Sequence, residues 1–292
     1  MSDFSPTDLL EELLHLQTPL DEPGSGRVRY GAAMALWRAG RLSEAQLEVY
    51  REAAAHDERD PSKMLKARGL PIVVDGSDDY TIAIKSLAAA AETYLLALSH
   101  PGQEDVRRGL ARRGSTPQSI TPLSNPVVTR WLDAALSAIA SPHLALAKAI
   151  ADAAPHLRWV SYGAYPRDLI GDSFAEGHAF ASLIGKGAPY DMPDFKLGLF
   201  IIAPHVLYRD HMHPAAELYA PLTGPHGWRF GIDQPRQIKP AHEPVWNPSN
   251  QPHLTRTGST PFLAFYVWTS DVHAVAHVLP AKDWPELEKW HI

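Results

Sequence analysis

Apolar positions recur with a helical period in the first half of this 292-residue chain. Residues 82–98 are rich in alanine, and their larger apolar side chains fall on one side of a helix. Asn125-Pro126 supplies a capping residue and a first-turn proline for a helix over 127–139, and 144–153 predicts another. The first half is therefore predicted to be helical.

Two capping signals mark helices nearer the N-terminus. Ser5-Pro6 precedes an apolar stripe that runs to Leu14. Ser43 is followed three residues later by Gln46, the spacing of a capping box for a helix that extends to about Ala55.

The pattern changes near residue 155. Segments become β-branched or aromatic and are interrupted by Gly, Pro and Asn, which is typical of short strands. These segments are RWVSYGAY, HAFASLIG, FKLGLFIIAPHVLYR, ELYAPLTG, GWRFGI and FLAFYVW. About seven such strands favour a sandwich or barrel. We expect an α+β fold, with residues 1–154 a helical region, either a cap or a separate domain, and 155–292 a β-barrel.

Composition narrows the functional classes. The net charge of −6 argues against a nucleic-acid binder, whose phosphate contacts need a basic surface. No apolar run approaches the roughly 18 residues of a membrane span, and the N-terminal residues are acidic where a signal peptide is basic. We therefore expect a cytoplasmic protein that acts on a small molecule and binds neither nucleic acid nor membrane.

The chain has no cysteine, so a metal would need imidazole and carboxylate ligands. His211 and His213 lie two residues apart on a predicted strand, where side chains of this spacing point to one face. A turn then brings Glu217 beside them, and His253 is the candidate third imidazole. Such a set holds one divalent ion and leaves positions open for substrate. The alternative is that these histidines do not bind a common metal ion.

These residues resemble the cupin superfamily. Residues 211–224 fit its first motif, H-x-H-x3-E-x6-G, and 248–253 fit the second, P-x-G-x2-H, with Asn250 in place of glycine. His205 stands where the family has a glycine, and Thr257 where it has an asparagine. The resemblance implies a double-stranded β-helix, or jelly-roll, barrel with His211, His213, Glu217 and His253 as the metal set.

Tyr219 follows Glu217 by two and should face the same cavity, as a ligand, a general base, both, or a packing residue. The pattern Y-x2-H-x-H-x3-E-x-Y, with a histidine about forty residues later, resembles the cupin lyases of dimethylsulfoniopropionate (DMSP) over about 194–271. The resemblance implies that Tyr219 removes an α-proton, that Tyr208 contacts substrate, and that dimethyl sulfide and acrylate are the products.

A sulfonium is a soft cation that aromatic faces hold well. The predicted substrate contacts are therefore aromatic: Trp228, Tyr266, Trp268 and Tyr162. Tyr266 and Trp268 lie two residues apart, so both side chains point to the same face of the predicted strand. Tyr208 and His211 are three residues apart, so their side chains point to opposite faces of a regular strand. Tyr208 therefore reaches the cavity only if the strand carries a bulge between them.

Other functions are compatible with the same ligands. Another metal-dependent cupin enzyme, such as a dioxygenase or isomerase, and a lyase relative with a different substrate both fit, because ligands do not fix the reaction. A non-catalytic ligand sensor is the third alternative. The ligand set suits Zn, Fe, Mn, Ni or Co, and the resemblance suggests a monomer or homodimer.

Overall fold

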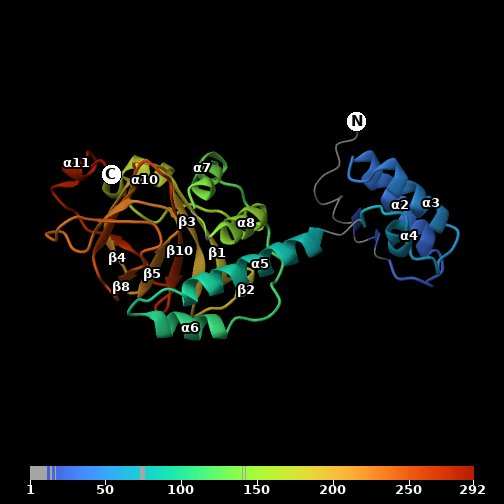
Figure 1. Ribbon diagram of the computed structural model, residues 1–292, viewed down its shortest axis with the longest axis horizontal. Helices are drawn as coiled ribbons and strands as arrows, with labels where there is room; N and C mark the ends of the chain where they lie inside the picture. Colours follow the sequence, from blue (N-terminus) through green and yellow to red (C-terminus); the bar gives the residue numbers. More distant parts are fainter. Residues whose placement is uncertain (1–11, 14, 17, 73–75, 140, 142) are drawn as a thin grey trace. The chain divides into compact units, whose positions relative to one another are not determined.

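The computed structural model describes residues 12–292, except 14, 17, 73–75, 140 and 142 (Figure 1). Most of the helix predicted from Ser5-Pro6 lies outside these residues. The chain divides into two compact units, Met1–Asp79 and Tyr80–Ile292. The predicted boundary at 154/155 marks the end of the helical region, whereas the compact units divide after Asp79.

In the described part of the first unit, helices pack around a small apolar core. They include α2 (Ser25–Arg38), α3 (Glu44–Ala53) and α4 (Pro61–Ala67). Leu36, Val49 and Leu65 are fully buried between them. The predicted capping box is confirmed, because the Ser43 hydroxyl accepts from the Gln46 amide while the Gln46 side chain accepts from the Ser43 amide.

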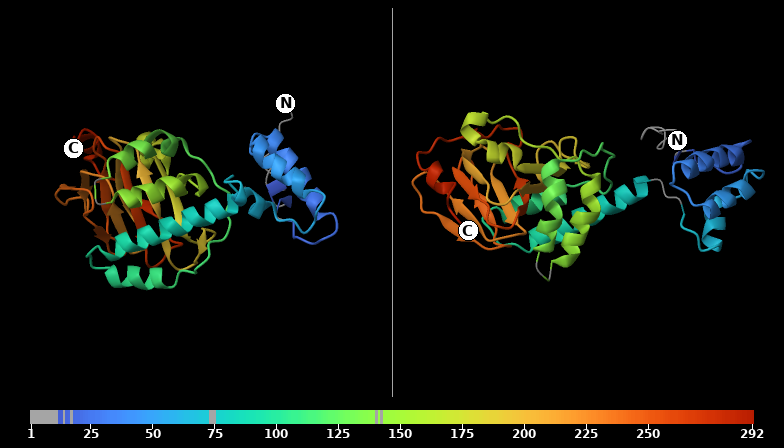
Figure 2. Two further views of the ribbon diagram at one scale, coloured as in Figure 1. Left: turned by 45° about the vertical axis from the view of Figure 1, so that its right-hand side comes forward. Right: turned by 90° about the horizontal axis from the view of Figure 1, so that it is seen from above.

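In the second unit, helices cover one face of a sheet (Figures 1 and 2). Asn125 caps α7 through its side chain, as predicted. The helical residues share one apolar core with strand residues such as Leu199 and Phe265, so they form a cover for the sheet. The larger helices are α5 (Gly76–Leu96), α6 (Gln103–Ala111), α7 (Pro126–Ser137) and α8 (Leu144–Ala153), and the short ones are η1 (Ala154–His156), α9 (Arg167–Ile170), α10 (Asp172–Glu176) and α11 (Trp284–Leu287).

Two sheets face each other in the second unit, and the functional residues come from both. The six-stranded sheet has the order β2 (Tyr190–Asp191), β1 (His178–Gly185), β3 (Lys196–Ile202), β10 (Phe262–Trp268), β5 (Glu217–Pro221), β8 (Val245–Asn247). The five-stranded sheet has the order β11 (His277–Val278), β4 (Leu207–Met212), β9 (His253–Arg256), β6 (His226–Arg229), β7 (Gln237–Lys239). All pairs except β1 with β2 are antiparallel.

The strand predicted at RWVSYGAY is wrong. Residues 158–165 contribute only isolated bridges, between Leu123 and Arg158 and between Val160 and Phe180. A tertiary contact explains the difference, because the Tyr162 amide donates to the His178 side chain instead of to a neighbouring strand, and Tyr162 and Tyr165 line a cavity. In the described part of the chain, no helix is both long and apolar enough to span a bilayer.

A buried ion pair supports strand β4 directly beside the predicted ligand His211. Asp210 is fully buried and receives two hydrogen bonds from Arg229, Nε to Oδ1 at 3.1 Å and Nη2 to Oδ2 at 2.5 Å. The Trp284 indole donates a further bond to Oδ2 at 2.9 Å. Loss of the Asp210 charge would leave the buried Arg229 with only the partly exposed Asp283 as its counter-ion, which compensates the buried charge incompletely.

Asp210→Asn is therefore expected to lower the free energy of unfolding by about 3–5 kcal/mol. Asp283→Asn is the matched control, because Asp283 pairs with the same Arg229 but is 40% exposed. The control should cost no more than about 1 kcal/mol. Urea unfolding of both variants measures this, and equal losses would contradict the burial argument.

His226 is held neutral by its hydrogen bonds. Its Nδ1 accepts from the Gly258 amide at 3.2 Å, and its Nε2 lies 3.2 Å from the Thr223 hydroxyl. That hydroxyl already donates to the Pro261 carbonyl, so Nε2 carries the proton and donates. Burial lowers the pKa of His226 to about 4.

Since the pKa of His226 is lower in the folded chain than the roughly 6.5 of an unfolded histidine, folding disfavours the proton. The stability that the neutral ring contributes is complete above about pH 6.5 and is lost as the pH falls toward 4. His226→Gln removes this titration. Urea unfolding across this range should show the wild-type advantage over His226→Gln shrinking by up to about 1.4 kcal/mol per pH unit. A constant difference would contradict the assignment.

Candidate metal centre and active-site cavity

The four predicted ligands come from three strand ends that meet inside the barrel. His211 lies in β4, and His213 follows that strand by one residue. His253 begins β9 and pairs directly with His211. Glu217 begins β5 after the turn at Pro214. The sheet pairing therefore brings together residues that are far apart in sequence.

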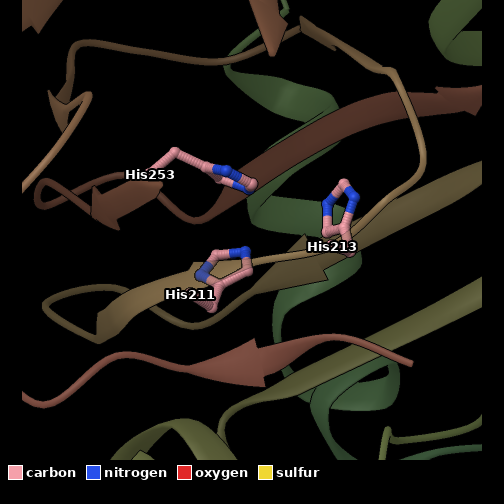
Figure 3. A group of neighbouring side chains, drawn as sticks. All are labelled: His211, His213 and His253. Carbon is pink, nitrogen blue, oxygen red and sulfur yellow. The ribbon is translucent and has the colours of Figure 1, made fainter. Parts of the chain in front are cut away.

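The three imidazoles converge on one point (Figure 3). One nitrogen from each of His211, His213 and His253 lies within 4.8 Å of the other two, and all three side chains are buried. This group could hold a metal ion.

Backbone carbonyls fix the orientation of each ring. The Nδ1 atoms of His211, His213 and His253 lie 2.8, 2.9 and 2.8 Å from the carbonyls of Arg209, Ala215 and Gln251. A carbonyl only accepts, so each Nδ1 carries the proton and each Nε2 presents a lone pair. Carbonyl partners of this kind commonly orient metal-binding histidines.

Glu217 faces the same lone pairs. Its Oε2 lies 3.2 Å from Nε2 of His213 and 3.4 Å from Nε2 of His253. Its Oε1 accepts a hydrogen bond from the Trp268 indole at 2.7 Å. Burial raises the pKa of Glu217, but the positive charge that His213 and His253 carry when protonated brings it well below its usual range, so the carboxylate is ionised. Burial lowers the pKa of His213, but Glu217 outweighs this effect and raises it.

These donors fit a divalent cation. Nε2 of His211 and Nε2 of His253 are buried with no hydrogen-bond partner among the described residues. Burial and the neighbouring imidazoles of His253 and His213 hold the pKa of His211 well below its usual value, so this ring is neutral. Lone pairs and a carboxylate that point at each other repel unless a positive charge lies between them.

The sequence departures from the cupin motifs have local explanations. Asn250 and His205 both have left-handed backbones, with φ of 59° and 58°, which is the conformation that glycine adopts without strain. Thr257 donates from its hydroxyl to the Ala203 carbonyl at 2.8 Å and accepts from the Val206 amide at 2.7 Å. It therefore fastens the turn before β4.

A largely aromatic cavity opens beside the centre and contains about 640 Å³ of space, its open mouth included. His213 and Glu217 form part of its wall, and the remaining lining residues are Tyr162, Tyr165, Phe174, His178, Phe180, Lys196, Phe200, Tyr208, Tyr219, Tyr266, Trp268, Ala274 and Ala276.

Most of the aromatic residues singled out in the sequence line this cavity. Tyr266 and Trp268 face it together, as their parity predicted, and Tyr162 and Tyr219 also line it. Tyr208 reaches it because the pairing of β4 with β9 shifts register between Tyr208 and His211, which is the required bulge.

Trp228 differs, because it is fully buried outside the lining. Its ring lies 5.8 Å from that of Tyr219 and 5.9 Å from that of Phe262. It comes from β6, and it supports the residues that line the cavity instead of facing the space itself.

Sequence reasoning missed several lining residues. The Tyr165 hydroxyl lies 2.7 Å from that of Tyr208. His178 donates from Nδ1 to the Phe174 carbonyl at 2.6 Å and accepts the Tyr162 amide at 2.8 Å through Nε2, which anchors the segment of the two tyrosines. No local motif marks these residues. Lys196 and Phe200 could have been found, since their even spacing in KLGLF places them on one face.

Comparisons with known proteins agree with this architecture. The profile of the dimethylsulfoniopropionate lyase family matches residues 107–264, more than half of the chain. The DMSP lyase DddQ of Ruegeria pomeroyi is 28% identical over 173 residues, which cover 59% of this chain and 82% of that protein.

Solved structures give the same result for the fold. The crystal structure of DddQ from Ruegeria pomeroyi matches with a TM-score of 0.57 at 24% identity and covers 69% of this chain and 97% of that one. A chain from the crystal structures of the DMSP lyases RdDddP and RnDddQII matches with a TM-score of 0.55 at 20% identity, over 68% and 98% of the two chains. The expected α+β fold, a helical region followed by a cupin barrel, is confirmed. By its family profile and its barrel, the chain belongs to the cupin-type DMSP lyase family.

Proposed function

We propose that this protein is a metal-dependent carbon–sulfur lyase that converts DMSP to dimethyl sulfide and acrylate. One observation carries the proposal: three imidazole lone pairs and an ionised carboxylate converge beside an aromatic cavity, and His213, Glu217 and Tyr219 line that cavity. The family membership supports the same activity.

The proposed ligands of a single divalent ion (Zn, Fe, Mn, Ni or Co) are His211, His213, Glu217 and His253, which leave one side open toward the cavity. When bound, the ion would supply positive charge that holds a substrate carboxylate, stabilises the charge developing on it, and favours the phenolate of Tyr219.

Tyr219 is the proposed general base. It is buried and lies in β5 two residues from Glu217, and its ring centroid lies 6.3 Å from that of His253. Burial and the Glu217 carboxylate raise the pKa of Tyr219 well above its usual value, so the uncompensated site holds a neutral phenol. As the phenolate that a bound cation favours, formed once its own proton has passed to solvent, Tyr219 would take the α-proton of DMSP. The electrons of that C–H bond form the new double bond, and the Cβ–S bond breaks to release dimethyl sulfide.

Tyr208 is the proposed second phenol of the site. It stacks on His211 at 3.8 Å between ring centroids, and its hydroxyl forms a hydrogen bond with that of Tyr165. Burial raises the pKa of Tyr208 well above its usual value, so it is a hydrogen-bond donor and positions substrate without accepting its proton.

The remaining aromatic wall suits a sulfonium. Tyr162, Tyr266 and Trp268 present ring faces or edges to the cavity, and aromatic faces attract cations when water is excluded. These three are the proposed substrate contacts. A cytoplasmic location and a monomeric or homodimeric state stay predictions from the sequence.

The metal proposal predicts about one divalent ion per folded chain by elemental analysis after incubation with each candidate metal. His253→Ala removes one proposed ligand and should weaken binding at least about 10-fold, since even indirect partners of a metal site have effects of this size. The exposed His273→Ala is the matched control and should keep the ion. Folded wild-type protein that retains none of these metals would refute the ligand set.

The lyase proposal predicts that metal-loaded protein releases dimethyl sulfide from DMSP into the headspace. Tyr219→Phe should lower kcat by about 100- to 10,000-fold, the usual contribution of a general base, with metal content unchanged. Tyr190→Phe is the control, because the buried Tyr190 hydroxyl lies outside the cavity and has no hydrogen-bond partner among the described residues. Full turnover by Tyr219→Phe would exclude the phenolate mechanism.

A further inference from the structure

A row of side chains crosses the cavity face of the six-stranded sheet. Lys196 of β3 pairs with Trp268 of β10, which pairs with Glu217 of β5, which pairs with Asn247 of β8. Directly paired residues of neighbouring strands point to the same face. Lys196 therefore faces the same side as the proposed ligand Glu217, two strands away.

Lys196 has the surroundings of a binding residue that lacks its partner. It is half-buried, and its Nζ lies 5.0 Å from the centroid of the Trp268 ring. Among the described residues, none places a carboxylate within 4.0 Å of it, and no other lysine or arginine lines the cavity. Burial lowers the pKa of Lys196, while Glu217 acts in the opposite direction.

A desolvated ammonium is unfavourable without a counter-ion, so an anion that enters this cavity gains from meeting it. Farther along the same sheet face, Phe200 of β3 and Phe180 of β1 pair with each other and form an uncharged aromatic wall of the lining, to which Phe174 also contributes. The cavity thus has a cationic end and an aromatic wall, which is the arrangement that orients a small molecule with one charged end.

The spacing fits a small acid. Neighbouring strands lie about 4.8 Å apart, so the backbones of Lys196 and Glu217 are separated by roughly 10 Å. Trp268 lies between them in the row, and all three side chains project from the sheet face. A small carboxylate that meets Lys196 therefore lies close to the Trp268 ring, and a longer acid would need to extend along the aromatic wall.

We infer that Lys196 determines specificity by donating a hydrogen bond to the carboxylate of a small acid, which the proposed ion would also attract, and by repelling a cationic group toward the aromatic wall. The inference rests on the proposed function only in assigning the substrate to this cavity. For a zwitterion such as DMSP, the charge on Lys196 would select one orientation, because the reversed molecule places its sulfonium against the ammonium.

The test uses acrylate, a small unreactive carboxylate, and acrylamide, its neutral analogue. Dissociation constants are measured by ligand-observed NMR titration of the metal-loaded full chain. Lys196→Met keeps the apolar stem on Trp268 but removes the charge, and Lys196→Arg keeps the charge. Lys186→Met is the matched control, since Lys186 is exposed and lies outside the lining. Thermal melts confirm that each variant is folded.

Lys196→Met should weaken acrylate binding by about 10- to 100-fold, as expected for one charged hydrogen bond. Lys196→Arg should stay within about threefold of wild type, Lys186→Met should bind as wild type does, and acrylamide should not distinguish the variants. With DMSP as substrate, Lys196→Met should raise KM by a similar factor with little change in kcat.

Three results would overturn the inference: unchanged acrylate binding in Lys196→Met, equal loss of acrylamide binding, or no acrylate binding to the wild-type protein. A different result separates it from the proposed function. If acrylate binding depends on Lys196 but no dimethyl sulfide is released by any metal-loaded form, the lyase proposal fails and the carboxylate site stands.

Discussion

The buried carboxylate of Glu217 is the constraint on which the rest of the site depends. An ionised group in a dry interior is costly unless opposite charge and hydrogen bonds surround it. Here the Trp268 indole satisfies one oxygen, and the other faces the lone pairs of His213 and His253. Because backbone carbonyls fix the proton of each neutral ring on Nδ1, only a second proton on a ring or a bound cation places positive charge between these nitrogens and the carboxylate. A cation is the group that reconciles these demands.

Much of this centre could be predicted from the sequence because its determinants are local. The H-x-H spacing gives one face of a strand, the turn at Pro214 fixes the approach of Glu217, and Asn125 and the Ser43 box cap helices within a few residues. The sequence showed that Tyr208 needs a bulge to face the cavity, but it could not show that the bulge exists. Its presence depends on how β4 pairs with β9, and the register between strands that are distant in sequence is not encoded by either strand alone.

The remaining features could not be predicted because they arise from packing between remote segments. The alternating pattern at 158–165 resembles a strand, but tertiary contacts hold this segment off the sheet, with the Tyr162 amide bonded to His178. Trp228 is an aromatic residue of the kind that binds cations, yet its position on β6 places it behind Tyr219. The division after Asp79 likewise depends on which helices share the core of the sheet, which periodicity does not reveal.

The register of the six-stranded sheet suggests how the cavity orients its contents. Successive rows across β3, β10 and β5 change in character: Lys196, Trp268 and Glu217, then Gly198, Tyr266 and Tyr219, then Phe200, Ala264 and Pro221. Gly198 is required in the middle row, because a Cβ there would lie 2.6 Å from the Tyr266 ring. Polarity therefore falls from charged to phenolic to apolar along the strands. A zwitterion held with its carboxylate at the charged row would present its α-carbon to the phenols and its sulfonium to the rings beyond. The order of the rows is thus also the order of the groups in the proposed substrate.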